Sequence, residues 1–160
     1  MVSPPKVVPL APGDPVPSFS LLDQDGHIVR PEDFAGSRLF IFFYPRANTG
    51  GCTAQAQAVQ EALERLDTLG VKVIGISPDS PSTQKRFAEK YGLTYPLLSD
   101  ADHLVAEAFG VWGEKQVRGK AVQGIIRSAF LFDASGTLVQ AWSPVSPKDT
   151  VPKLLEALKV

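Results

Sequence analysis

Residues 38–52 read RLFIFFYPRANTGGC, and this stretch decides the fold. Its first seven residues are an almost continuous apolar run, which is typical of a β-strand buried on both faces. Pro45 ends that strand, and an irregular loop follows it. From Cys52 to Leu69 the composition favours a helix, because alanine, glutamine, glutamate, leucine and arginine dominate. A buried strand that leads directly into a helix is the basic unit of an α/β protein.

Flanking segments predict further strands and helices around this unit. Asp25-Gly26 is a strong turn signal between two short apolar segments, so we expect a small hairpin there. Strands and helices alternate early in the chain and a strand pair comes late, which indicates an α/β fold with a central mixed β-sheet flanked by helices and an N-terminal β-hairpin. Strands are expected at 19–22, 27–30, 71–77, 97–98, 125–132 and 137–142, and helices at 82–91, 100–109 and 146–158.

The organisation of the chain is that of one domain behind a short arm. Residues 1–16 are rich in proline and poor in large apolar side chains, so they are expected to form an extended N-terminal arm. Residues 17–160 are enough for one domain with a proper core and too few for two.

Composition and charge exclude several classes of protein. Hydrophobic residues make up 44% and charged residues 21%, which argues against a disordered chain. The formal net charge of -1 gives no sign of a basic surface that would bind nucleic acid or an anionic membrane. The one cysteine cannot form an internal disulfide and fits a reducing compartment. No signal peptide and no apolar run of about 20 residues is visible, so we expect a cytoplasmic protein.

The chemistry of the chain is expected at Cys52. A helix N-terminus has backbone N–H groups without partners, and its dipole favours negative charge, so both stabilise a thiolate. Gly50 and Gly51 keep the loop free of side chains, which lets a small ligand approach the backbone. Thr49 has a hydroxyl that can donate or accept a hydrogen bond three residues before the cysteine.

Each of these residues also has an ordinary interpretation. A single cysteine is more often an inert core residue than a nucleophile, and Thr49 alone could be a helix cap. Arg127, judged by spacing alone, would be a surface ion-pair residue. His27 and His103 are expected at a turn and at a helix start, so neither is expected to pair with Cys52 or to bind a metal.

The pattern Pro-x-x-x-Thr-x-x-Cys, present here as Pro45, Thr49 and Cys52, resembles the active-site motif of peroxiredoxins. The surrounding sequence is similar to the bacterioferritin-comigratory-protein, or PrxQ, branch of that family, in particular VWGEK at 111–115 and GIIRSAF at 124–130. The resemblance extends over nearly the whole chain. It implies a thioredoxin-like fold for the domain.

The resemblance also implies a function. It makes residues 17–160 a peroxiredoxin domain and the chain a thiol-dependent peroxidase, which reduces hydrogen peroxide and organic hydroperoxides through a sulfenic acid at Cys52. The Thr49 hydroxyl, the Cys52 backbone N–H and the Arg127 guanidinium would stabilise the transition state, and Pro45 would shield the site. No cofactor or metal is implied. Substrate contacts are expected from Tyr44, Gly50, Gly51 and Gln55.

Recycling is where the sequence departs from many PrxQ proteins. Many PrxQ proteins carry a resolving cysteine five residues after the first cysteine, and the residue at that position here is Gln57. Others carry it in the following helix, and 82–91 holds no cysteine either. The partner of the oxidised enzyme is therefore expected to be an external thiol. A small thiol, a thioredoxin, a glutaredoxin or transiently Cys52 of another copy would all serve, and we expect a monomer.

Two further departures lie beside the cysteine. Gly50 stands where proline is common, and Gln55 stands where glutamate is common. A neutral Gln55 is expected to leave Arg127 more available to the thiolate and to hold its orientation less tightly.

Two other functions remain as alternatives. A peroxide sensor on the same scaffold would form the same sulfenic acid and transfer it to a partner protein, and a non-catalytic redox binding protein would keep its cysteine in the core. A dithiol oxidoreductase is excluded, because Thr49 occupies the first position of a Cys-x-x-Cys motif.

Overall fold

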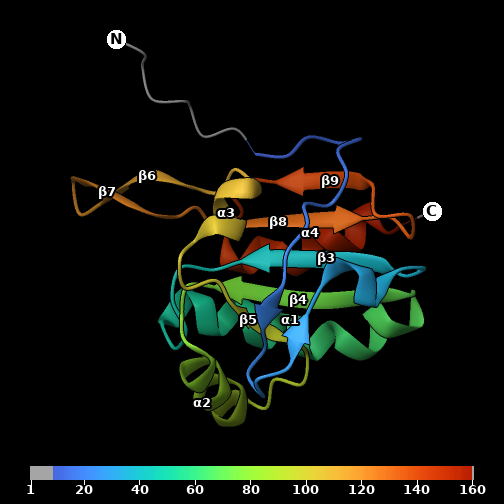
Figure 1. The fold of residues 1–160 in the computed structure, drawn as a ribbon, viewed down its shortest axis with the longest axis horizontal. Coiled ribbons are helices and arrows are strands. Elements are labelled where there is room, and N and C mark those ends of the chain that lie inside the picture. The colour runs from blue at the N-terminus through green and yellow to red at the C-terminus, as the bar shows by residue number, and fades with distance from the viewer. Residues whose placement is uncertain (1–8, 160) are drawn as a thin grey trace.

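Seven β-strands form one mixed sheet at the centre of the molecule (Figure 1). The structure is a computed structural model that describes residues 9–159, apart from the side chains of Gln116 and Val117, so 1–8 of the expected arm lie outside it. The strand order is β2-β1-β5-β4-β3-β8-β9; β3 is parallel to β4 and β4 to β5, whereas the other neighbours are antiparallel. The bounds are β1 Leu21–Leu22, β2 Ile28–Val29, β3 Arg38–Phe43, β4 Val71–Ser77, β5 Leu97–Ser99, β8 Ser128–Phe132 and β9 Leu138–Trp142.

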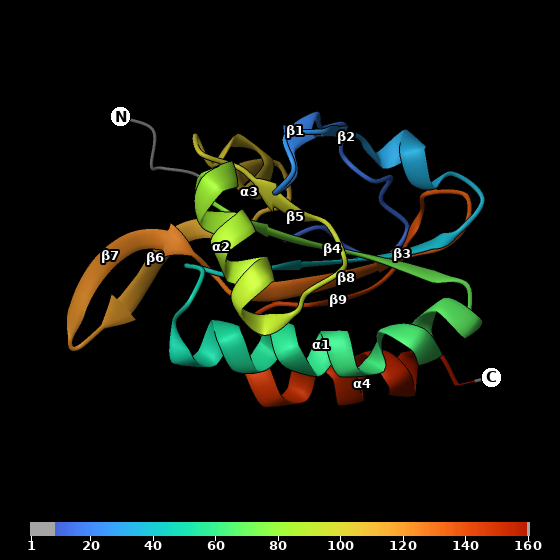
Figure 2. The same ribbon diagram turned by 90° about the horizontal axis from the view of Figure 1, so that it is seen from below.

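Helices cover both faces of this sheet. α1 and α4 lie side by side against one face and α3 lies on the other, while the β1–β2 hairpin continues the sheet beyond β5 (Figure 2). None of the helices in 9–159 combines the length and the apolar character that crossing a bilayer requires. The bounds are α1 Gly50–Thr68, α2 Pro81–Tyr91, α3 Leu104–Ala108 and α4 Thr150–Ala157, with 3-10 turns η1 Pro31–Phe34 and η2 Pro147–Asp149. The expected α/β fold with a central mixed sheet and an N-terminal hairpin is confirmed.

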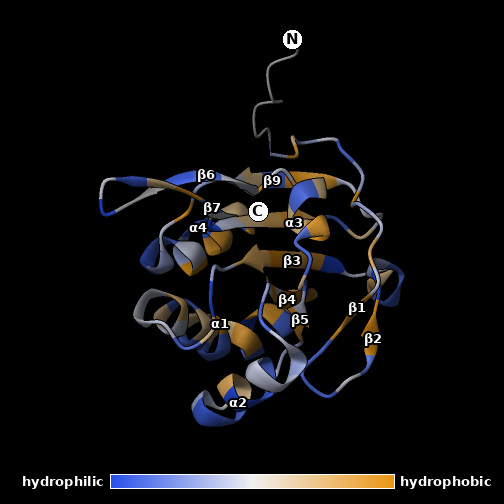
Figure 3. Ribbon diagram, turned by 60° about the vertical axis from the view of Figure 1, so that its left-hand side comes forward, coloured by the Kyte–Doolittle hydropathy of each residue, from blue (hydrophilic) through white to orange (hydrophobic). Residues whose placement is uncertain are grey.

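The central strand β3 is buried on both faces, as its apolar run predicted. Phe40 and Phe42 pack into the core under α1, α2 and α4, and Ile41 and Phe43 pack into a second core on the opposite face. All four side chains are fully buried. In Figure 3 the strands of the sheet are mostly hydrophobic, whereas the helices are mixed. The loop that follows β3 therefore starts from a rigid support.

The expected strand at 125–132 is wrong, because the chain forms two separate strands there. β7 (Lys120–Ile125) ends before Arg127, and β8 begins after it. β7 pairs with β6 (Trp112–Val117) in a two-stranded ribbon that projects from the body (Figures 1 and 2). The ribbon turns at Arg118 and Gly119, both at positive φ, which matches the twist of a tight hairpin. Sequence analysis missed this ribbon.

Four smaller differences concern three helix starts and the arm. The α2 helix is capped by Ser80, whose hydroxyl accepts the Thr83 N–H, so it begins at Pro81 and not at Ser82. The last helix begins as η2 and becomes α-helical at Thr150, and α3 begins only at Leu104. The described part of the arm, 9–16, lies along the end of β9 and exchanges backbone hydrogen bonds with it.

Candidate active site

The β3–α1 junction places Cys52 at the third position of a helix. Thr49 is the N-cap residue, with an extended backbone, and Gly50 begins α1. The N–H groups of Gly50, Gly51 and Cys52 therefore have no acceptor within the helix and point toward its N-terminal end. Thr49 thus occupies the N-cap position, as one of its two interpretations predicted, but its side chain makes no capping hydrogen bond.

Cys52 and Arg127 lie in contact, although 75 residues separate them in sequence. The Arg127 guanidinium donates from Nη2 to Cys52 Sγ at 3.2 Å. Arg127 belongs to the short connection between β7 and β8, and its carbonyl accepts the Val145 N–H at 2.9 Å, which fixes the backbone there. Cys52 is only 1% exposed, whereas its neighbours in sequence Thr49, Gly50 and Gly51 are exposed.

A chain of hydrogen bonds holds the guanidinium from its other side. Arg127 Nη1 donates to Gln55 Oε1 at 2.7 Å, Gln55 Nε2 donates to Thr150 Oγ1 at 2.8 Å, and Thr150 Oγ1 donates to the Ser146 carbonyl at 2.9 Å. Gln55 is fully buried. Its amide therefore has one orientation in which every bond is satisfied, and Arg127 is held at both of its amino groups. Gln55 faces the arginine and not an open substrate space.

The two glycines differ in what surrounds them. A Cβ at Gly51 would lie 3.3 Å from Pro147 Cγ and 3.4 Å from Arg127 Nη2, whereas one at Gly50 would meet nothing within 4 Å. Gly51 thus allows the close packing of the guanidinium against the first turn of α1. Gly50 faces open space, so its surroundings do not explain why a glycine stands there.

Thr49, Pro45 and Tyr44 take different positions around the cysteine. Thr49 Oγ1 donates to the Arg46 carbonyl at 3.0 Å, so its lone pairs remain to accept a hydrogen bond. Pro45 is half-buried at the end of β3. Tyr44 is buried in the core and donates to Gln84 Oε1 at 2.6 Å, and burial raises the pKa of its hydroxyl far above the ordinary value. The Tyr44 hydroxyl therefore makes its hydrogen bond inside the core.

Lys115 is a residue of this site that sequence reasoning did not single out. It lies on β6, and its Nζ donates to the Ile125 carbonyl at 3.0 Å. A Cβ at Gly124 would lie 3.0 Å from Lys115 Cε, so the lysine stem lies across the glycine on the paired strand. Burial lowers the pKa of Lys115, the nearby charge of Arg127 lowers it further, and Cys52 acts in the opposite direction.

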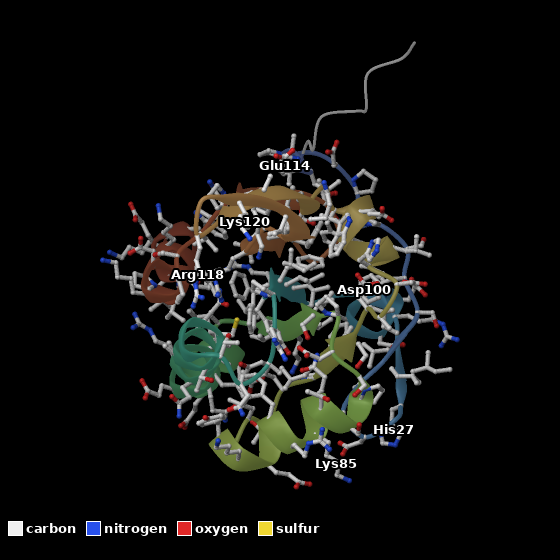
Figure 4. The ribbon with its side chains drawn as sticks, turned by 90° about the vertical axis from the view of Figure 1, so that its left-hand side faces the viewer. His27, Lys85, Asp100, Glu114, Arg118 and Lys120 are labelled. Atoms are coloured by element: carbon white, nitrogen blue, oxygen red, sulfur yellow. The ribbon has the colours of Figure 1, made fainter. Side chains whose placement is uncertain are left out.

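The ribbon therefore contributes to the region of the cysteine. It carries Lys115 on β6 and leads at its end directly into Arg127. Figure 4 shows the ribbon from this side, marked by Glu114, Arg118 and Lys120. The only sequence signal for Lys115 was its place in the VWGEK run, and its position follows from a strand pairing that the sequence did not reveal.

The fold and the cysteine–arginine pair define a thioredoxin-like thiol peroxidase. Residues 12–141 match the family model described as the AhpC/TSA family, and the chain belongs to this family. The family is the one that the Pro-x-x-x-Thr-x-x-Cys motif indicated.

Its relatives place the chain in the Bcp/PrxQ branch of the peroxiredoxins. It is 52% identical over 130 residues to peroxiredoxin Bcp of Escherichia coli K12, which covers 81% of this chain and 83% of that protein. It is 44% identical over 151 residues to a putative peroxiredoxin Bcp of Haemophilus influenzae, covering 94% and 97%. A structure of peroxiredoxin Q from Xanthomonas campestris matches with a TM-score of 0.82 and 37% identity, covering 88% and 89%. The chain is thus a Bcp-type thiol peroxidase with one cysteine.

Proposed function

We propose that this chain is a one-cysteine peroxiredoxin that reduces hydrogen peroxide and organic hydroperoxides at Cys52 and is recycled by an external thiol. The observation that carries the proposal is the 3.2 Å contact between Arg127 Nη2 and Cys52 Sγ at the N-terminus of α1. A fixed cation and unpaired N–H groups both favour a thiolate at this position. Substrates of the organic type are supported by the alkyl peroxide reduction activity of the related bacterioferritin comigratory protein of Xanthomonas campestris.

The first half-reaction is a displacement at oxygen. The Cys52 thiolate attacks the terminal, hydrogen-bearing oxygen of ROOH, an S–O bond forms and the O–O bond breaks. The sulfenic acid keeps this hydroxyl group, and the alkoxide leaves and takes up a proton to become an alcohol. Arg127 faces the negative charge that spreads over the sulfur and both oxygens, and the free N–H groups of the first helical turn face the same charge. Thr49 Oγ1 would accept a hydrogen bond from the hydroperoxide O–H, because its own hydrogen is donated to the Arg46 carbonyl.

The second half-reaction requires a thiol from outside the chain. Cys52 is the one cysteine of the sequence, so a sulfenic acid formed there has no intramolecular partner. An external thiol condenses with the sulfenic acid to a mixed disulfide and water, and a second thiol releases the reduced enzyme.

Steady-state turnover of Cys52→Ser tests the proposal. The parent enzyme should consume many equivalents of hydroperoxide when dithiothreitol is supplied, and its oxidised form should gain one oxygen atom by intact mass. Cys52→Ser should fold but show no turnover, because a serine hydroxyl is a far weaker nucleophile than a thiolate. Residual peroxidase activity in that variant would refute the assignment. A parent protein that reacts once and then stops in the presence of dithiothreitol would favour the peroxide sensor instead.

A further inference from the structure

A positively charged cavity lies beside the loop that leads to Cys52. It has a volume of about 420 Å³ and is formed between this loop and α2. Concave sites of roughly 300–1,000 Å³ are typical of small-molecule binding. The proposed mechanism assigns no role to this cavity. The polar residues that line it are Arg46, Asn48, Asp79, Thr83, Arg86 and Lys90.

The charge of the cavity is positive and largely uncompensated. Arg46, Arg86 and Lys90 are exposed, and within the described part of the chain no carboxylate lies within 4.0 Å of any of them. Arg86 Nη2 donates to the neighbouring Thr83 hydroxyl at 3.3 Å, which leaves its other donors free. Three cationic side chains thus face one carboxylate, that of Asp79.

Asp79 has a structural task that accounts for its presence among these cations. Its Oδ2 accepts the Ala47 N–H at 2.7 Å and the Ser77 hydroxyl at 2.7 Å. The carboxylate thereby ties the loop before Cys52 to the end of β4. The carboxylate keeps its negative charge, but three cationic side chains outnumber it, so the cavity retains a net positive charge for a ligand.

The cavity and the cysteine share one rigid loop. Asn48 lines the cavity, and its Oδ1 accepts a hydrogen bond from the Tyr91 hydroxyl of α2 at 3.0 Å. Asn48 lies four positions before Cys52, so their Cα atoms lie at most about 14 Å apart. A small molecule anchored on the arginines could therefore extend toward the sulfur.

We propose that this cavity binds the carboxylates of an anionic, low-molecular-weight thiol, and that this thiol recycles Cys52. The proposal rests on the proposed one-cysteine function, which requires an external thiol. The thiolate of the bound molecule attacks the sulfenic sulfur, an S–S bond forms, the S–O bond breaks, and hydroxide leaves and takes up a proton as water. A second molecule of the same thiol then reduces the mixed disulfide and is itself oxidised.

The test compares two thiols that differ only in their carboxylates. Glutathione and its diethyl ester have the same thiol and nearly the same size, but the ester lacks both negative charges. Peroxide is kept saturating so that recycling limits turnover, and the second-order rate constant of each thiol is measured. The parent enzyme should prefer glutathione over the ester by about tenfold, and the preference should weaken with added salt.

Arg86→Glu and Lys85→Glu form a matched pair of variants. They are adjacent, exposed positions of α2 with the same change of charge, but only Arg86 lines the cavity; Figure 4 shows Lys85. Arg86→Glu should lower the ratio of the glutathione rate constant to the ester rate constant by about tenfold, and adding Lys90→Glu should lower it further. Lys85→Glu should keep the ratio within about twofold of the parent.

The outcomes separate this inference from the proposed function. An enzyme that turns over with dithiothreitol but shows the same ratio in the parent and in Arg86→Glu would overturn the anionic-thiol site and leave the peroxidase intact. An equal fall in both variants would overturn it as well, because the effect would be one of total charge. If charge reversal lowers the rate of recycling by a protein dithiol but not by glutathione, the surface is a protein docking site, and the proposal is contradicted as well. Absence of turnover with every thiol would refute the one-cysteine function itself.

Discussion

Replacing Gln55 by glutamate should make the Cys52 thiolate harder to form. Gln55 and Cys52 bind opposite amino groups of one guanidinium, at 2.7 Å and 3.2 Å. A carboxylate at position 55 would add a negative charge to the far side of Arg127, and two anions would then share one cation. The buried Thr150 hydroxyl would also have to turn and donate to the new carboxylate, because its present bond to Gln55 is one in which it accepts.

The size of the effect follows from the separation of the two anions. The contacts of 2.7 Å and 3.2 Å to one guanidinium place the two anions at most about 8 Å apart. At an effective dielectric constant of about 20 they would then repel by at least about 2 kcal/mol, which corresponds to about 1.5 pH units. A stronger ion pair between Arg127 and the new carboxylate offsets part of this repulsion. We therefore expect the pH midpoint of thiolate formation to rise by about one to two units. At a fixed pH below the midpoint, the reaction with peroxide should slow by about tenfold to a hundredfold.

The assay is a pH series of the single-turnover reaction with hydrogen peroxide, together with the ultraviolet absorbance of the thiolate. Gln57→Glu is the matched control, because Gln57 is an exposed residue of the same helix and undergoes the same chemical change. Gln57→Glu should leave the midpoint nearly unchanged, and the slow reaction of Gln55→Glu should recover at high pH. A Gln55→Glu profile that superimposes on the parent would show that the neutral amide has no electrostatic role. A midpoint that moves down would contradict the charge argument itself.

Three further changes probe the surroundings of the site. Gly51→Ala would place a methyl group 3.3 Å from Pro147 Cγ and 3.4 Å from Arg127 Nη2, so a small shift of this packing should slow the peroxide step by about threefold. Gly50→Ala, whose methyl meets nothing within 4 Å, should retain the parent rate; stopped-flow kinetics compare the two, and equal rates would contradict the packing argument. Lys115→Gln should slow the same step about threefold and shift its pH profile upward, since a cation near the thiolate is lost, and an unchanged profile would make the lysine structural. Burial raises the pKa of Asp100 above its ordinary value of 3.8, so this group stabilises the fold below that pH, and the stabilisation is lost as pH rises through the raised pKa. In Asp100→Asn the free energy of unfolding in urea should no longer fall across this pH range. A parallel pH dependence in both proteins would refute the argument.

The central unit of the fold was predictable because its signals are local and strong. The apolar run that becomes β3 is buried on both faces, and the composition after Cys52 favours a helix at every turn. The strand at Val71–Ser77 was predicted with its bounds for the same reason. These segments surround the cysteine, so its position at a helix N-terminus could be foreseen.

The β6–β7 ribbon could not be foreseen, because it lacks the pattern that reveals a half-buried strand. The residues of β7 from Lys120 to Gln123 are all exposed, so no apolar and polar alternation develops. Its turn is Arg118–Gly119, and an arginine at a φ of 52° is not a usual turn residue. Ile125 to Phe132 was therefore predicted as one strand, although the backbone N–H of Ile126 donates to the Val111 carbonyl instead of to the sheet.

The contacts within the site depended on pairings between distant segments. The resemblance named Arg127 and Cys52, but the bond from Gln55 to Thr150 spans 95 residues and rests on the packing of α4 beside α1. Sequence reasoning treated Gln55 as a neutral replacement that holds the arginine loosely. The structure instead shows that the Gln55 amide makes a hydrogen bond at each end. The sequence reasoning missed this because it did not consider the helix that supplies Thr150.

The paired ribbon limits how this region of the chain can change in length. Side chains on a strand alternate between two faces, so one residue added or removed between Trp112, which stacks on His103, and Lys115 would turn the lysine to the opposite face of the ribbon. Changes on the tip side of Lys115 leave its distance from Trp112 at the base of the ribbon unaltered. Loop grafts or tags placed at Arg118–Gly119 should thus be tolerated, whereas a single residue inserted between Trp112 and Lys115 should alter the surroundings of the cysteine.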